Sequence, residues 1–432
     1  MMDVVTMTVV SAIKSEAKRK LAVTISKTSQ LIETCLGSDD LRLEDNAFTR
    51  KRRLGAQKTL RIILHRIYCS LQLCLDKYFD EIGEIPVSKQ AFSKARRNLN
   101  PEYVRKFADA SSEAAAEDAT MPDYKGMRLI AIDGSDVALE NTKELKDEFG
   151  CSGPKKNSAT ALSSIAFGPL DHVIYDCRID RYDTDERTLA KAHVGRLTEL
   201  GLKGSLLLFD RGYPSADFIA SLYESGYPFV MRVRRKFNIE VDNIKTQGWI
   251  NLYHNDKAYP VRVLKIKLPS GEIETLLTSL HQKQLPISQA GELYFNRWGV
   301  ETAYDIIKSK LELENFSGKT KVSVFQDFYA TIYLANLAAF ANEEADELIS
   351  AADSGKNMKY HRKSNCNRTI SRLRAVFLSL IMEPDASMRN DMLDKLVLYI
   401  SRYPVPVVPD RSPPRKSPRN KRFFQNRRSV VG

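Results

Sequence analysis

Four side chains of complementary chemistry are spaced along the segment YFNRWGVETAYDIIK. Tyr294, Arg297, Glu301 and Lys308 follow the pattern Y-x2-R-x3-E-x6-K. Because steps of three, four and seven residues return to one face of an α-helix, we expect all four on one face of a single helix. A carboxylate beside two cations and a hydroxyl suits a site that holds a divalent metal next to phosphate oxygens. An Arg–Glu pair four residues apart is also commonly a solvated ion pair, so this spacing alone leaves both interpretations open.

Two aspartates follow short apolar runs upstream of that segment. Asp133 closes the run 127–132 and Asp210 closes the run 206–209, and both runs have the composition of a buried strand. Two aspartates at strand ends and a glutamate on a later helix can converge on one site. Three carboxylates of this kind form the clamp that holds two divalent cations for attack on a phosphodiester. Taken singly, each aspartate is equally well explained as a turn residue.

Together these segments resemble the signature of DDE-type insertion-sequence transposases that carry a Y-R-E-K box. Asp-Gly-Ser, Asp-Arg-Gly-Tyr and the four-residue box occur here in the family's order. The resemblance implies that Asp133, Asp210 and Glu301 are catalytic residues and bind two Mg²⁺ ions, for which Mn²⁺ can substitute. It also implies DNA-phosphate contacts beside the cleaved end from Tyr294, Arg297 and Lys308, with Arg211 and Trp298 as further candidates.

The same resemblance implies a function. The expected activity is cut-and-paste transposition by a homodimer on double-stranded DNA. Such an enzyme binds the terminal inverted repeats of its element, cleaves strands with the help of metal ions and transfers them to target DNA. Two alternatives remain: a catalytically silent, domesticated DNA-binding relative, and a ribonuclease-H-like nuclease without strand transfer. The intact acids and box disfavour the first alternative, and the box with its surrounding domains disfavours the second.

An α/β core between residues 127 and 233 is expected to position the two aspartates. The apolar pattern predicts three strands, a helix, a strand, a helix and a strand. This is the order of a ribonuclease-H-like core, which the resemblance also implies. The expected strands are 127–132, 161–168, 172–179, 205–209 and 228–233, and the expected helices are 185–200 and 216–226.

A β-rich insertion is expected at about residues 234–280, between the second aspartate and the glutamate. Residues 238–243 and three later runs have strand-like patterns, with turns at Asp242-Asn243 and at 269–271. Trp249 lies in this insertion. In relatives an insertion aromatic can stack on a flipped DNA base, but a core tryptophan of a small sheet explains Trp249 equally well.

Residues 1–120 are expected to form a helical, DNA-binding domain. One long amphipathic helix is predicted at residues 57–79, and Ser88 can cap a short helix that carries Lys94, Arg96 and Arg97. Such a helix could enter a major groove, although a solvated basic face fits its spacing equally well. The stretch also resembles the N-terminal domain of the transposase family, which favours recognition of DNA ends.

The remaining organisation follows from composition. The catalytic domain is expected at residues 121–345, a helical C-terminal region at 346–403, and a tail at 404–432. The last 23 residues carry eight basic side chains and one acidic side chain among several prolines. That composition predicts a disordered tail that attracts phosphate non-specifically.

Overall composition restricts the class of partner. The 432-residue chain has a formal net charge of +12 and 43% hydrophobic residues, which together indicate real cores and a polyanionic partner. Nucleic acid and anionic membrane surface both meet that requirement, but no apolar stretch is long enough to span a membrane. The N-terminus has no basic leader, and none of the six cysteines forms a C-x-x-C pair. We therefore expect no zinc site, and a bacterial cytoplasmic protein associated with the nucleoid.

Overall fold

A computed structural model describes residues 19–50, 52–65, 70–154 and 157–408. These residues form two compact units that interleave along the chain. The second unit comprises Ala115–Ala138 and Lys146–Ile306, and the first comprises the rest of the described chain. Asp133, Asp210 and Glu301 all fall in the second unit.

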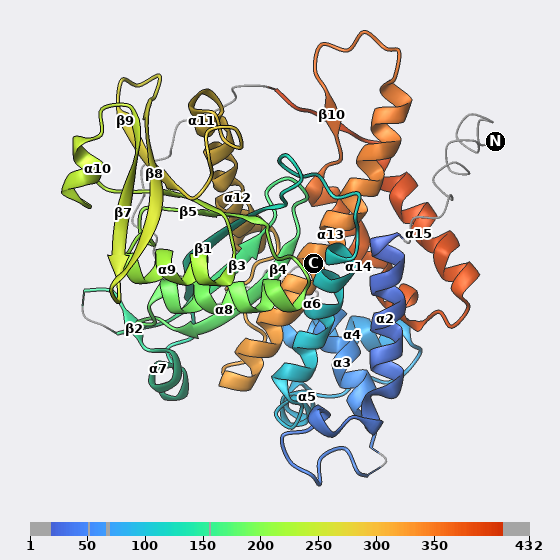
Figure 1. The fold of residues 1–432 in the computed structure, drawn as a ribbon. Coiled ribbons are helices and arrows are strands. Elements are labelled where there is room, and N and C mark those ends of the chain that lie inside the picture. The colour runs from blue at the N-terminus through green and yellow to red at the C-terminus, as the bar shows by residue number, and fades with distance from the viewer. Residues whose placement is uncertain (1–18, 51, 66–69, 155–156, 409–432) are drawn as a thin grey trace. The chain divides into compact units, whose positions relative to one another are not determined.

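The second unit is built on a large mixed sheet, which has nine strands in the described part of the chain. Its strands run in the order β2-β3-β1-β5-β6-β9-β8-β7, with β4 paired to β3 (Figure 1). In chain order the strands are β1 Leu129–Ala138, β2 Cys151–Ser152, β3 Ser158–Phe167, β4 Ile174–Arg181, β5 Leu206–Phe209, β6 Phe229–Arg232, β7 Gln247–His254, β8 Lys257–Lys267 and β9 Ile273–Thr278.

Strand direction changes across this sheet. Strands β4, β3 and β1 are antiparallel neighbours, whereas β1, β5 and β6 are parallel. Parallel neighbours need crossover connections, which are provided here by helix α8, Glu186–Glu199, and helix α9, Ala216–Ser225. Figure 1 shows these helices side by side, and they contact each other. All seven strands and helices predicted between residues 127 and 233 are present in the predicted order, but the prediction missed helix α7, Lys143–Phe149, and strand β2, which lie between β1 and β3.

The inserted segment extends the same sheet. Strand β9 pairs antiparallel with β6, and β8 and β7 follow it outward. The prediction of a β-rich insertion is confirmed, but residues 238–243 are not a strand. They include helix α10, Ile239–Asn243, because the Asn238 side chain accepts hydrogen bonds from the N–H groups of Glu240 and Val241 and so caps a helix.

The prediction of one regular helix through the Y-R-E-K segment is wrong. The segment is divided among helix α11, Ile287–Phe295, a 3₁₀ turn, Asn296–Trp298, helix α12, Gly299–Asp305, and a π-helical turn, Ile306–Lys310. Close packing explains the change at Gly299. A β-carbon there would lie 2.9 Å from Cβ of Pro169, so only glycine lets α12 begin this close to the β3–β4 turn.

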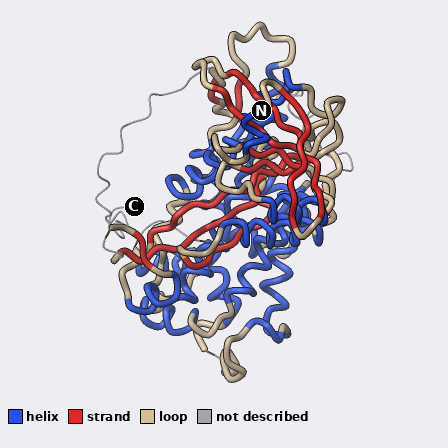
Figure 2. Tube along the Cα trace, turned by 60° about the vertical axis from the view of Figure 1, so that its left-hand side comes forward, coloured by secondary structure: helices blue, strands red, loops and turns tan. Residues whose placement is uncertain are grey.

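The first unit is mainly helical (Figure 2). Helix α13 is its centre, because apolar residues on all its sides are buried and it contacts α2, α3, α14 and α15. The helices that lie in or begin in this unit are α2 Lys20–Thr34, α3 Ala56–His65, α4 Leu71–Glu81, α5 Lys89–Arg96, α6 Pro101–Ala116, α7 Lys143–Phe149, α13 Lys321–Asp353, α14 Cys366–Met382 and α15 Ala386–Ser401. Short 3₁₀ turns, Cys35–Gly37 and Asp39–Leu41, follow α2.

Two predictions for the first unit need correction. The single helix predicted at 57–79 is described as the two helices α3 and α4, and residues 66–69 lie outside the described residues. The predicted disordered tail begins too early, because β11, Val405–Pro406, pairs with β10, Arg362–Lys363. Residues 409–432 lie outside the described residues. No helix in the described ranges is both long enough and apolar enough to cross a membrane.

Candidate functional site

The register of two parallel strands brings the predicted aspartates to the same level. Strands β1 and β5 pair from Leu129 with Leu206 up to Ala131 with Leu208. Asp133 and Asp210 each lie two residues beyond that last pair (133 − 131 and 210 − 208). Ligands commonly bind where the carboxyl ends of neighbouring parallel strands part.

Asp133 is not the end of its strand, contrary to the prediction. It lies inside β1, opposite Ile165 of β3, and the strand continues to Ala138. The interpretation of Asp133-Gly134 as a turn is therefore wrong. Antiparallel pairing to β3 carries β1 past the point where its pairing with β5 stops. The backbone of Asp133 is thus fixed on one side and open on the side of Asp210.

Arg297 is the common partner of the three predicted acids. Its side chain is only 3% exposed; one terminal nitrogen donates to Oε1 of Glu301 at 2.9 Å, and the other lies 3.6 Å from Oδ2 of Asp133. Burial alone would lower the pKa of Arg297, but Tyr294, Glu301 and Asp210 around it together raise that pKa. A buried, charged guanidinium therefore pairs with two of the carboxylates, and the charge of the third, Asp210, also acts on it.

Two aromatic rings hold this guanidinium in place. Its central carbon lies 4.6 Å from the ring centre of Trp298 and 5.9 Å from that of Tyr294. The Tyr294 hydroxyl donates to the carbonyl oxygen of Phe209 at 3.2 Å and lies 3.5 Å from Oδ1 of Asp210. Burial raises the pKa of Tyr294, so the phenol stays protonated and ties α11 to the end of β5.

The charge balance of the site is negative. Burial, with the nearby charges of Glu186 and Asp210, raises the pKa of Asp133 to about 7, although Arg297 and the Gly134 N–H oppose this rise. The carboxylates exceed the cations that face them, and carboxylate oxygen is the donor that hard divalent cations prefer. The donor chemistry thus fits a divalent ion. Within the described residues, however, no three Asp, Glu, His or Cys side chains converge as a ready-made metal-binding group, and Arg297 bridges the acids instead.

We expect Asp133→Asn to stabilise the protein at alkaline pH when EDTA removes metal ions. An unfolded aspartate has a pKa near ~4. The folded protein therefore holds this proton more tightly, and its free energy of unfolding falls as pH rises from about 4 to about 7. The difference of about 3 between the two pKa values corresponds to at most about 4 kcal/mol.

Thermal unfolding between pH 4.5 and 8.5 measures this effect. The asparagine variant should melt several degrees above the wild type at pH 8, and the gap should narrow towards pH 4.5. A gap that is the same at every pH would show that Asp133 does not titrate in this range.

Glu186 is a fourth carboxylate at the site, and sequence reasoning missed it. It is the first residue of α8, after the capping residue Asp185. A β-carbon on Gly134 would lie 3.1 Å from its carboxyl carbon, so the absence of a side chain lets Glu186 approach β1 beside Asp133. Burial first, then the charges of Glu186 and Asp133, raise the pKa of the enclosed Tyr213 well above its ordinary value. The one sequence signal for this close approach was the glycine directly after Asp133.

Tyr304 joins the helix of Glu301 to the strand of Asp133. The buried Tyr304 hydroxyl lies 3.1 Å from the carbonyl oxygen of Asp133 and 3.0 Å from that of Ser163, and it can donate to one of them at a time. Tyr304 follows Glu301 by three residues, so the two lie on adjacent turns of α12. Its place in the Y-R-E-K segment was the only sequence signal for this role.

A buried polar network links α8 to β4 and β3, and through β3 to the strand of Asp133. His193 of α8 lies with Nδ1 2.7 Å from Oδ2 of Asp176 and Nε2 3.0 Å from Oγ of Ser164. The Ser164 hydroxyl donates to the carbonyl oxygen of Asp133 at 3.4 Å. All three side chains are buried, so this network is structural and fixes α8 against β3 and β4.

The inserted strand β9 also reaches the site. Glu274 is buried, and its carboxylate lies 3.4 Å from Nε of Arg232 on β6. Burial raises the pKa of Glu274; Arg232 and Arg297 oppose the rise and Asp210 adds to it. The insertion therefore adds a further acid, Glu274, to the surroundings of Asp210. The strand pattern of the insertion did not predict this role for Glu274.

Other predicted contact residues are spread over the molecule. Arg211 is exposed directly after Asp210. Trp249 is 44% exposed on β7, with its ring centre 5.0 Å from that of His281, so its interpretation as a core tryptophan is wrong. Lys308 belongs to the first unit, where its ammonium lies 3.9 Å from Oε1 of Glu314. DNA contacts by these residues stay predictions.

The three basic residues predicted on the short helix differ in burial. Lys94 and Arg97 are exposed, but Arg96 is only 2% exposed. Its guanidinium donates to Asp327 at 2.9 Å and to the side-chain oxygen of Gln326 at 2.8 Å, both on α13. The predicted DNA contact from Arg96 is therefore wrong, because its side chain fastens α5 to α13.

The middle of the chain matches a protein-family model. Residues 124–337 match the family model described as "Transposase DDE domain". This segment contains all three predicted acids and the whole Y-R-E-K segment.

Two curated proteins of Escherichia coli (strain K12) are similar to this chain. The putative transposase InsZ is 24% identical over 196 residues, which are 43% of this chain and 63% of that protein. The transposase InsG for insertion sequence element IS4 is 22% identical over 346 residues, which are 72% of this chain and 74% of that protein. The matched part thus spans less than two thirds of InsZ.

A solved structure aligns with much of this chain. A cryo-EM structure of the piggyBac transposase synaptic complex with hairpin DNA aligns with a TM-score of 0.46 and 13% identity. The alignment covers 87% of this chain and 84% of that one.

Proposed function

Because residues 124–337 belong to the transposase DDE domain family and the chain is a relative of insertion-sequence transposases, we propose that it is a DNA transposase. The proposed reaction starts with binding to the terminal inverted repeats of its element. It continues with metal-dependent cleavage of DNA strands at the element ends, and it finishes with strand transfer into target DNA.

The observation that carries this proposal is the position of Arg297. Residues distant in the sequence, Asp133 on β1 and Glu301 on α12, meet at one buried guanidinium, and the charge of Asp210 also acts on it. A solvated surface ion pair, the alternative explanation of the Arg–Glu spacing, would not be buried in this way.

We assign Asp133, Asp210 and Glu301 as the catalytic carboxylates that would hold two Mg²⁺ ions, or Mn²⁺ in their place. When bound, such ions supply Lewis-acid activation of water and stabilise the departing 3′ oxygen. Burial, with the nearby charges of Glu186 and Asp210, raises the pKa of Asp133, and this supports the assignment because a bound cation would favour the ionised carboxylate.

The other residues of the box are assigned to DNA phosphate. Arg297 has five N–H donors, of which its Nε–H is buried with no acceptor among the described residues. Tyr294 keeps its proton and serves as a hydrogen-bond donor, so the proposed chemistry needs no covalent tyrosine intermediate. Lys308 adds a point charge for phosphate, and Arg211, Trp298 and Trp249 are further proposed DNA contacts.

The fold supports a ribonuclease-H-like catalytic core. Its support is the strand order β4-β3-β1-β5-β6, with three antiparallel strands followed by two parallel ones. We keep as proposals a DNA-binding region at residues 1–120, a catalytic domain at 121–345 and a C-terminal region at 346–403. We also propose a homodimer on double-stranded DNA, acting in the bacterial cytoplasm on the nucleoid.

A cleavage assay with the gene's own flanking DNA tests the function. Purified wild-type protein is incubated with this DNA in Mg²⁺, Mn²⁺ or EDTA, beside Asp210→Asn. We expect metal-dependent cuts at both element ends from the wild type, and binding without cuts from the variant. Binding without any cut by the wild type would indicate a DNA-binding remnant. Cuts scattered without regard to the ends would indicate a general nuclease.

A further inference from the structure

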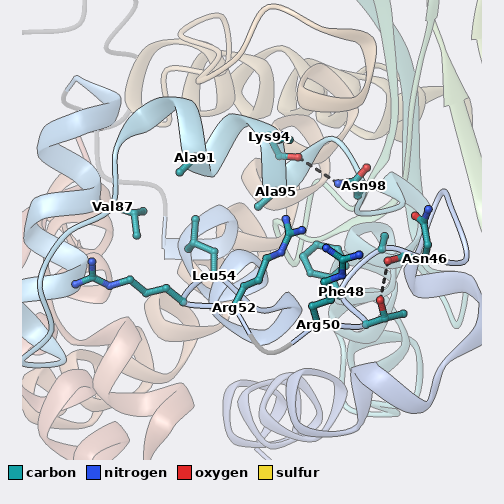
Figure 3. Close-up of a pocket in the computed structure, with 13 residues that line it drawn as sticks. Asn46, Phe48, Arg50, Arg52, Leu54, Val87, Ala91, Lys94, Ala95 and Asn98 are labelled. Carbon is teal, nitrogen blue, oxygen red and sulfur yellow. Dashed lines mark hydrogen bonds between the residues drawn. The ribbon is translucent and has the colours of Figure 1, made fainter.

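A pocket of about 490 Å³ lies in the first unit, whereas the predicted acids belong to the second. It is formed by residues 46–50 and 52–54 of one loop and by α5 with the residues around it (Figure 3). We call it the basic pocket. Its lining residues are Asn46, Ala47, Phe48, Thr49, Arg50, Arg52, Arg53, Leu54, Val87, Ala91, Lys94, Ala95 and Asn98.

The charge of the basic pocket has one sign. Three arginines and Lys94 line it, and no Asp or Glu is among its described lining residues. Arg50 and Arg52 are exposed, and neither forms an ion pair within the described chain. Arg53 differs, because its guanidinium donates to the carbonyl oxygen of Ile85. Two arginines thus remain available to an anion from outside.

The walls of the basic pocket leave room beside these cations. Ala91 and Ala95, one helical turn apart on α5, present only methyl groups to it. Figure 3 shows the side chains of Arg50 and Arg52 rising from the loop into the space below α5, with the ring of Phe48 beside them. Phe48 has a left-handed backbone, with φ of 56°, which turns the chain just before the arginines. A neutral donor is also present in the Asn46 side-chain amide, whereas the Thr49 hydroxyl already donates to the carbonyl oxygen of Asn46.

We propose that the basic pocket binds the sugar–phosphate backbone of double-stranded DNA. Guanidinium forks match phosphate oxygens in pairs, and the alanines and Phe48 form a small apolar wall suited to a deoxyribose. The cations lie on two chain segments, with Arg50 and Arg52 on the loop and Lys94 on α5. A single free phosphate would not need both segments, whereas a DNA backbone that crosses the pocket would contact both. The proposal rests on the proposed function only for the identity of the polyanion.

This assignment changes the role of α5. The sequence left open whether this helix enters a major groove or presents a solvated basic face, and in the structure Arg96 is turned inward to Asp327 and Gln326. With Ala91 and Ala95 on the wall of the basic pocket, α5 acts as a support for phosphate binding. Backbone contacts position a protein on DNA without reading sequence. The affinity that this pocket supplies should therefore be independent of base sequence.

Arg50→Ala/Arg52→Ala in the full-length protein tests the proposal. The affinity for duplex DNA is measured in EDTA at several salt concentrations, with the element end and with a random sequence. We expect a loss of roughly 10- to 100-fold on both DNAs, and a salt dependence of log K that is shallower by about 2, near 0.9 for each lost phosphate contact. Arg50→Lys/Arg52→Lys should recover most of the salt dependence, because the charges remain.

The matched control is Lys395→Ala/Arg402→Ala, which removes the same charge from exposed positions on and just after α15. An equal loss of DNA affinity in the control and the test variant would show that only net charge matters, and would overturn the proposal. An unchanged salt dependence of DNA binding, in a test variant that melts like the wild type, would also overturn it. Wild-type binding of inorganic phosphate that the double variant abolishes, with DNA affinity unchanged, would make the pocket a small-anion site.

The pocket and the proposed function can fail separately. Binding in EDTA needs no cleavage, so a wild type that never cuts can still show the pocket's salt dependence. Conversely, the wild type and the double variant could bind DNA equally well and cut equally well at the element ends. That result would contradict the proposal for the basic pocket and support the proposed transposase function.

Discussion

Glu301→Gln is expected to lower the rate of metal-dependent strand cleavage by about a thousandfold while DNA affinity stays near that of the wild type. The amide preserves the shape of the side chain but removes the charge proposed to hold metal. Loss of one such ligand is expected to cost about 4 kcal/mol of transition-state stabilisation, which corresponds to that factor. The Glu301 side chain is 46% exposed, so the substitution should change the stability of the fold little.

Cleavage rates at the element end in Mg²⁺, with DNA affinity measured in parallel, test this expectation. The matched control is Glu292→Gln, since Glu292 is an exposed acid on α11 one turn before the 3₁₀ segment. Full cleavage by Glu301→Gln would remove this residue from the proposed set of carboxylates. Equal losses in both variants would indicate a general effect of negative charge on this surface.

The second large effect is expected from Arg297→Ala, which should reduce both stability and cleavage. Removing a buried partner leaves the carboxylates of Asp133 and Glu301 without their cation, and such a loss typically costs 3–5 kcal/mol. We expect about 3 kcal/mol, at the lower end, because Glu301 is partly solvated and Asp133, with a pKa of about 7, can take up a proton. Cleavage should fall by at least about a hundredfold as the guanidinium contact to phosphate is lost.

A double-mutant cycle separates these contributions. If Arg297 stabilises the fold by balancing Asp133, then Arg297→Ala should cost much less in an Asp133→Asn background, with a coupling of about 1–3 kcal/mol. Arg297→Lys keeps the charge without the planar fork and should recover part of the stability but little of the cleavage. Additive effects of the two substitutions in chemical denaturation would contradict the role of Arg297 as counter-ion to Asp133.

The part of the site that could be predicted consists of residues whose signal is local. Asp210 follows a run of four apolar residues, and the spacing from Tyr294 to Glu301 lies within one segment. Strand and helix periodicities are also local, which is why the longer strands and the two crossover helices between residues 127 and 233 were predicted in the right order, whereas the short elements α7 and β2 were missed. Segment geometry was less predictable, since the close approach of Gly299 to Pro169 depends on a turn more than 100 residues earlier.

Burial of individual polar residues could not be predicted. Lys94, Arg96 and Arg97 have the same chemistry on one short helix, yet only Arg96 is enclosed, because α13 supplies Asp327 and Gln326 to its side. Glu186, Glu274 and Tyr304 likewise carry no distinctive spacing. They reach the surroundings of Asp133 and Asp210 through the packing of α8, β9 and α12, which brings together segments far apart in the chain.

The sequence by itself determined the type of chemistry. Three acids, a box of side chains proposed to bind phosphate, a basic chain and an α/β order all follow from residue identity and short-range pattern. Tertiary structure alone decided which charges face each other. The buried Arg297 among three carboxylates, the raised pKa of Asp133 and the unpaired arginines of the basic pocket depend on burial and on distances between remote segments. Electrostatic energies vary steeply with both quantities, and neither is encoded in local spacing.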